Sequence, residues 1–304
     1  ARKATDVPSP GESPAVARRR VRLALRKARE ATGWSQGVVA DRTGWSLSKV
    51  QRIEAGDVSV SGTDLRALLD LYGVTDAEEI DLLLEEARIS RRQRWWTAQK
   101  FRDHLTPAYA QLLQFENEAT AIRVYQPVLV PGVLQTRSYA DTIISWYSKS
   151  LSAEDRQVRL DVRMQRRRNF ADADDGAQFL LILDESALQR NIGGPAIMAE
   201  QLTELAGVAR RPNVNIRIVP LEQGAILGVI GPFVVLDLSD EPGDAVLYRE
   251  SYVRDDLNHD RAEVQFHRQI FEDLWSLSLD EEQSISAIEA EAAVLRSRAQ
   301  RGRP

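Results

Sequence analysis

Glycine divides the first quarter of this sequence into short pieces. Gly33, Gly44, Gly56 and Gly73 each follow helix-forming residues, and glycine ends helices readily because it tolerates positive φ angles. Most of the pieces open on a serine, whose hydroxyl can accept the free N–H groups of a first helical turn. This pattern predicts helices at residues 15–31, 35–43, 46–55 and 61–72. Helices this short must pack on one another, so we expect an all-α domain.

A fifth helix is expected at residues 75–89. Thr75 precedes it and Glu78 follows three residues later, which is the spacing of a capping box. A proline-rich stretch precedes the helices and a basic, aromatic stretch follows them. We therefore expect a flexible arm at residues 1–14, the five-helix domain at 15–90, a linker at 91–106 and a second domain at 107–304.

The second and third helices form the candidate functional site. A tight turn at Gly44 joins them, and Val39, Val50 and Ile53 are spaced to face a common core. The outer face of the third helix then carries short or hydrogen-bonding side chains: Leu47, Ser48, Lys49, Gln51 and Arg52. A face of this kind suits a recognition helix in the major groove of DNA.

Each side chain of this face has a chemical counterpart on duplex DNA. Arg52 can pair with guanine, Gln51 and Ser48 with adenine or phosphate, and Leu47 with a thymine methyl. Gln36, in the first turn of the second helix, can reach a phosphate. The alternative is a helical bundle that binds other proteins instead of DNA.

Residues 21–74 resemble the Cro/C1-type (XRE) helix-turn-helix family. The motifs that carry the resemblance are Leu25-Arg26-Lys27-Ala28-Arg29, Gly33-Trp34-Ser35-Gln36, Gly44 and Val50-Gln51-Arg52-Ile53-Glu54-Ala55-Gly56. The resemblance implies a buried ion pair between Arg29 and Glu54. It also implies DNA contacts from Gln36, Ser46, Leu47, Ser48 and Arg52. Trp45 is a departure, since it is unusually large for the turn.

Charge is distributed unevenly along the chain. Residues 1–56 carry 12 Lys and Arg against 5 Asp and Glu, a balance of +7, so the remainder carries 28 against 40, a balance of −12. A basic end on an acidic chain predicts that this end meets phosphate. The sequence contains no cysteine, no apolar run long enough for a membrane span and no signal-peptide pattern, so we expect a cytoplasmic protein that makes no membrane contact.

The second domain is expected to be α+β with a small, mostly antiparallel sheet. Its β-rich runs lie at residues 121–130, 178–184, 213–221, 231–238 and 244–252. Helical periods lie at residues 107–118, 136–148, 153–171, 195–210, 260–276 and 280–298. The turn between the last two β-rich runs, Ser-Asp-Glu-Pro-Gly, indicates a hairpin.

The whole chain resembles actinobacterial WhiJ-like regulators, which join an XRE domain to a second domain of unknown function. Segments 124–136, 184–190, 213–220 and 231–233 carry this resemblance. It implies an antitoxin-like regulator with a small partner protein similar to BldB. Tyr125, Gln135 and Tyr139 flank a Pro-Gly turn, so they are either buried structural residues or the lining of a ligand or partner pocket.

Nothing in the sequence favours an enzyme. The three histidines, His104, His259 and His267, belong to no metal-binding or nucleophile motif, so we expect no catalytic site, metal or cofactor. We expect a homodimeric, sequence-specific transcription regulator that binds a double-stranded operator and receives a small-molecule or partner signal through its second domain. The alternative is an antitoxin-like interaction module that binds a small partner protein and whose DNA binding is secondary and autoregulatory.

Overall fold

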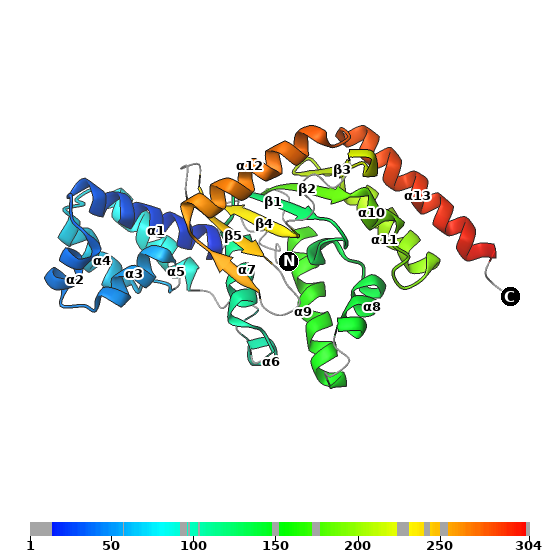
Figure 1. The fold of residues 1–304 in the computed structure, drawn as a ribbon. Helices are drawn as coiled ribbons and strands as arrows, with labels where there is room; N and C mark the ends of the chain where they lie inside the picture. The colour runs from blue at the N-terminus through cyan, green and yellow to red at the C-terminus, as the bar shows by residue number, and fades with distance from the viewer. Residues whose placement is uncertain are drawn as a thin grey trace, which may run out of the picture. The chain divides into compact units, whose positions relative to one another are not determined.

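The computed structural model describes residues 14–56, 58–91, 96, 98–102, 104–147, 152–171, 177–223, 231–239, 244–249 and 255–301. The chain divides into two compact units, Ala1–Ala98 and Gln99–Pro304, which we call the head and the body. Figure 1 shows the elements of each. The predicted arm, residues 1–14, lies outside the described residues except for Pro14.

The head is helical. Its elements are α1 (Pro14–Ala31), α2 (Gln36–Thr43), α3 (Leu47–Ala55), α4 (Gly62–Tyr72) and α5 (Ala77–Ser90). The predicted serine caps are confirmed, because the hydroxyls of Ser35, Ser46 and Ser61 each accept a backbone N–H of the helix that follows. Thr75 as the cap of the fifth helix is wrong. Asp76 caps α5 instead, because its carboxylate accepts the N–H groups of Glu78 and Glu79.

Apolar side chains from α1 to α5 form one core in the head. Leu25, Val39, Val50, Ile53 and Leu65 are among its buried members. Two arginines also fasten α1 to α5: Arg18 donates to the backbone oxygen of Ser90 at 2.7 Å, and Arg20 pairs with the buried Glu86 at 2.7 Å. These two contacts therefore hold α1 against α5.

The body alternates helices and strands. Its helices are α6 (Gln99–Arg102), α7 (Pro107–Glu118), α8 (Arg137–Tyr147), α9 (Ala153–Ala171), α10 (Glu185–Gln189), α11 (Pro195–Val208), α12 (Arg261–Leu277) and α13 (Glu281–Arg301). Its strands are β1 (Ala121–Gln126), β2 (Gln178–Asp184), β3 (Val214–Val219), β4 (Phe233–Asp237), β5 (Ala245–Arg249) and β6 (Asp256–Asn258). Short 3₁₀ turns lie at η2 (Gly132–Leu134) and η3 (Leu221–Gln223).

The strands form one six-stranded mixed sheet in the order β3-β2-β1-β4-β5-β6. β1, β2 and β3 are parallel, whereas β4, β5 and β6 add antiparallel strands. The expectation of a small, mostly antiparallel sheet is therefore wrong. Helices α8 and α9 separate β1 from β2, and α10 and α11 separate β2 from β3; such crossovers return the chain in the same direction.

Helices cover both faces of the sheet. Val264, Ile270, Phe271 and Leu274 of α12 pack on one face. The other face packs on side chains of α7, α8, α11 and α13. Figure 1 shows α12 along one side of the sheet and α8 and α9 on the other. Successive side chains of β5 point to opposite faces of the sheet. Val246 and Tyr248 pack in one hydrophobic cluster, and Ala245 and Leu247 pack in the other. No helix within the described ranges has the length and apolar composition to cross a bilayer.

Candidate nucleic-acid interface

The α2–α3 unit is a helix-turn-helix whose turn is defined by local contacts. Gly44 ends α2 at a φ of 71°, and its N–H donates to the Ala40 oxygen. Ser46 then opens α3 by accepting the Lys49 N–H at 3.2 Å. Gly56 ends α3 at a φ of 79°. α3 thus has fixed ends and a length of nine residues.

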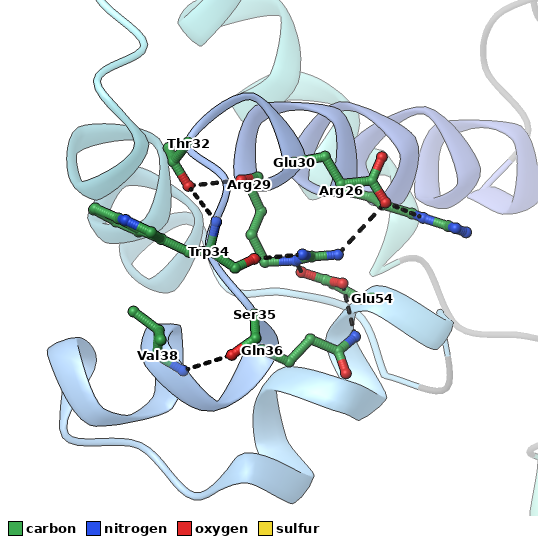
Figure 2. Close-up of polar contacts among 9 residues, drawn as sticks. All are labelled: Arg26, Arg29, Glu30, Thr32, Trp34, Ser35, Gln36, Val38 and Glu54. Atoms are coloured by element: carbon green, nitrogen blue, oxygen red, sulfur yellow. Dashed lines mark hydrogen bonds and ion pairs between the residues drawn. The ribbon is translucent and has the colours of Figure 1, made fainter.

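A buried polar network attaches α3 to α1 and α2. The Arg29 Nε donates to Glu54 Oε1 at 2.6 Å, and the Gln36 amide donates to Glu54 Oε2 at 2.8 Å. Arg29 also donates to the backbone oxygen of Trp34 at 2.7 Å. Figure 2 shows the Glu54 carboxylate between the Arg29 guanidinium and the Gln36 amide. Both carboxylate oxygens are therefore engaged, and Glu54 links α3 to α1 and α2.

The network shifts the ionisation of its members. The hydrogen bond from Arg29 to Glu54 raises the pKa of Arg29, so the guanidinium stays charged at any ordinary pH. Burial raises the pKa of Tyr72 to about 12, and the nearby negative charge of Glu54 adds to the increase. Tyr72 therefore remains a neutral phenol beside the pair.

The outer face of α3 is open to solvent. Leu47 is 46% exposed, and Ser48, Gln51 and Arg52 are exposed as well. Arg52 makes no ion pair within the part of the chain that the structure describes. Its five N–H donors remain available for a base edge or a phosphate.

Three other predicted contact residues already have partners inside the head. The Gln36 amide is directed at Glu54, and the Ser46 hydroxyl serves as the helix cap. The Lys49 ammonium lies 3.2 Å from the Asp64 carboxylate and 3.6 Å from the centre of the Trp45 ring. Trp45 itself packs partly buried against the core of the head.

Asp64 was missed by sequence reasoning, although a signal for it exists. It stands three residues after the cap Ser61, which is the acidic position of a capping box. Its N–H donates to the Ser61 hydroxyl at 3.0 Å, and its carboxylate accepts from the Lys49 ammonium at 3.2 Å.

Tyr125, Gln135 and Tyr139 are all buried, and the structure does not bring them into one pocket. The Gln135 amide donates to the Val130 oxygen at 2.7 Å, and the Tyr139 hydroxyl accepts the Val130 N–H at 3.3 Å. Tyr125 lies on the opposite face of the sheet, against Phe233. Gln135 and Tyr139 thus hold the loop after β1 in place, and Tyr125 is a core residue.

Comparison with known proteins agrees with this division of the chain. Residues 21–83 match the family model described as a helix-turn-helix domain. Residues 109–290, more than half of the chain, match the model described as a domain of unknown function, DUF5753. The chain belongs to the DUF5753 family. No curated protein and no solved structure matches it. In this DUF5753 protein the helix-turn-helix match supports a DNA-binding regulator, and its bounds enclose the whole polar network around Glu54.

Proposed function

We propose that this DUF5753 protein is a sequence-specific transcription regulator that reads duplex DNA with the outer face of α3. The observation that carries the proposal is Arg52, which is exposed, has no ion-pair partner among the described residues and lies on the same helical face as Ser48. A guanidinium in this position can bind the O6 and N7 atoms of guanine with two parallel hydrogen bonds.

The surrounding side chains complete a reading surface. Gln51 can bind adenine through its amide, Ser48 can donate to a base or a phosphate, and Leu47 can cover a thymine methyl. Precise placement matters for such contacts, because hydrogen bonds weaken steeply with poor geometry. The caps of α3 and the Arg29–Glu54–Gln36 network supply that placement.

We propose that the protein reads its operator as a homodimer. The nine residues of α3 span about 14 Å, which covers about four base pairs of duplex. A site this short recurs too often in a genome to be distinctive. Two heads bound side by side would double the length of the recognised sequence. The body would then hold the two copies together and receive a small-molecule or partner signal.

The test is selection of bound duplexes from a random pool, followed by salt titration on the selected sequence and on random DNA. Arg52→Ala is expected to lose about 1–3 kcal/mol on the selected duplex and much less on random DNA. Arg52→Lys keeps the charge but not the planar fork, so it should recover random binding while still losing selectivity. Arg88→Ala is the matched control, since Arg88 is an exposed arginine of α5 paired with Glu85.

Absence of any selected sequence for the wild type would overturn the proposal. The head would then be a protein-interaction module, and the antitoxin-like alternative could be tested by co-purification with a small candidate partner. Equal losses for Arg52→Ala and Arg88→Ala would place Arg52 outside the base-reading face. Sedimentation with and without the selected duplex would test the dimer separately.

A further inference from the structure

Lys49 differs from the other polar residues of α3 in where its charge lies. Its ammonium is held between the Trp45 ring, 3.6 Å from the ring centre, and the Asp64 carboxylate, 3.2 Å away. Trp45 belongs to the turn before α3, and Asp64 to the first turn of α4. One side chain thus connects the turn, the recognition helix and the next helix.

The position of Lys49 on α3 explains this orientation. Leu47, Ser48, Gln51 and Arg52 are exposed, whereas Lys49 is only partly exposed and lies beside the buried Val50 and Ile53. Its backbone N–H is used by the Ser46 cap, which fixes the first turn of α3. Its side chain therefore leaves the helix toward α4.

Asp64 is held independently of Lys49. Its N–H donates to Ser61, and its carboxylate stands at the amino end of α4, where the helix dipole stabilises negative charge. An ammonium stacked on an indole ring gains further electrostatic attraction. The two partners thus favour one position of the Lys49 side chain.

We propose that Lys49 is a positioning residue for DNA reading and makes no DNA contact of its own. It fixes Trp45 and the start of α3 against α4. The inference rests on the proposed function and assigns roles within the same interface: Arg52 contacts the bases, and Lys49 positions α3.

The experiment compares Lys49→Met, Asp64→Asn, the double variant and Lys49→Arg on the selected duplex and on random DNA across a salt range. Lys49→Met and Asp64→Asn should each weaken binding to the selected duplex about tenfold, with random DNA changed little. The double variant should be no weaker than Lys49→Met, because Lys49→Met already removes the ion pair with Asp64. The slope of log affinity against log salt should stay at the wild-type value, and Lys49→Arg should restore selectivity.

A phosphate contact by Lys49 predicts opposite results. Lys49→Met would then lower the salt slope by about one, and Asp64→Asn would tighten binding because it frees the ammonium. Either result, or no change in selectivity for both single variants, overturns the inference while leaving the proposed function intact. A wild type that selects no sequence would overturn both.

A measurement on the free wild-type protein tests the placement of Lys49 without DNA. The ε-methylene protons of Lys49 should resonate upfield in the free wild-type protein, since the ammonium to which they are adjacent lies over the Trp45 ring. Asp64→Asn should shift them toward the position of a free lysine. Unshifted protons in the wild type would contradict the proposed placement.

Discussion

The head and the body place their charged side chains differently. In the head, Glu54 gathers Arg29 and Gln36 from two other segments, while Arg52 on the outer face of α3 has no ion pair among the described residues. In the body, arginines beside the sheet pair with carboxylates.

Asp237 on β4 illustrates the use of charge in the body. It pairs with Arg123 of β1 and Arg268 of α12, so one carboxylate fastens α12 to two strands. Arg166 of α9 pairs in the same way with Glu116 of α7. These three arginines therefore stabilise the packing of the body, whereas Arg52 on α3 makes no ion pair among the described residues.

The largest expected effect comes from the centre of the head. Glu54→Ala leaves Arg29 and Gln36 without their shared acceptor, and Arg29 is only 12% exposed in the side chain. The free energy of unfolding of the head should fall by about 3–5 kcal/mol. Calorimetry should show a lower unfolding temperature for the head and an unchanged unfolding temperature for the body.

Glu85→Ala provides the control for this change. Glu85 pairs with Arg88 on the solvent-exposed side of α5, so its loss should cost less than about 1 kcal/mol. Equal losses from both variants would show that the buried network contributes no more than a surface pair.

Gly193 lies in the body where its backbone comes close to side chains of α8 and α11. It has a φ of 72°, and an added Cβ would lie 2.8 Å from Thr142 Oγ1 and 2.9 Å from Ile197 Cδ1. Gly193→Ala therefore combines backbone strain with a clash between α8 and α11 and should cost about 2–4 kcal/mol. Denaturant unfolding followed by circular dichroism measures it, and a loss below that of Gly44→Ala would mean that the two helices move apart easily.

Gly44 in the head has the same kind of backbone but open space around it. Its φ is 71°, and an added Cβ meets nothing within 4 Å. Gly44→Ala should therefore cost only the strain of the left-handed conformation, about 1–2 kcal/mol. Gly207→Ala is the control, since Gly207 lies within α11 at an ordinary helical φ and should be neutral or slightly stabilising.

The smallest expected effect is a loss of stability at alkaline pH, which can be measured for the head and the body separately. Burial raises the pKa of Tyr72 in the head and of Tyr125 in the body to about 12, against about 10 in an unfolded chain. The folded state then holds the phenol proton more tightly, so this contribution is complete below pH 10 and is lost as the pH rises toward 12. Tyr72→Phe should flatten the pH dependence of the head transition only, and Tyr125→Phe that of the body only. A variant that flattens both transitions would contradict separate unfolding.

Much of the head could be predicted because its signals are local. A serine hydroxyl reaches an N–H group three residues later, and a glycine ends a helix where it stands, so α2, α3 and α4 were readable from spacing. The same reasoning failed at α5 only by one residue, because Asp76 offers a stronger acceptor than Thr75.

Contacts between segments far apart in the chain could not be predicted from local sequence signals. The sequence located most strands of the body, but the order β3-β2-β1-β4-β5-β6 depends on which segments pair across crossovers, and the three-residue β6 has no pattern of its own. For the same reason the sequence could not separate Tyr125 from Tyr139, which lie on opposite faces of the sheet.

The candidate site divides in the same way. The sequence by itself determined that α3 is a short capped helix with Ser48 and Arg52 one turn apart on a polar face. Only the tertiary structure decided that Gln36 turns to Glu54 and Lys49 to Asp64 and Trp45. The physical reason is distance along the chain: caps and helical faces arise within one turn, whereas the direction of a long polar side chain depends on partners that folding brings from elsewhere.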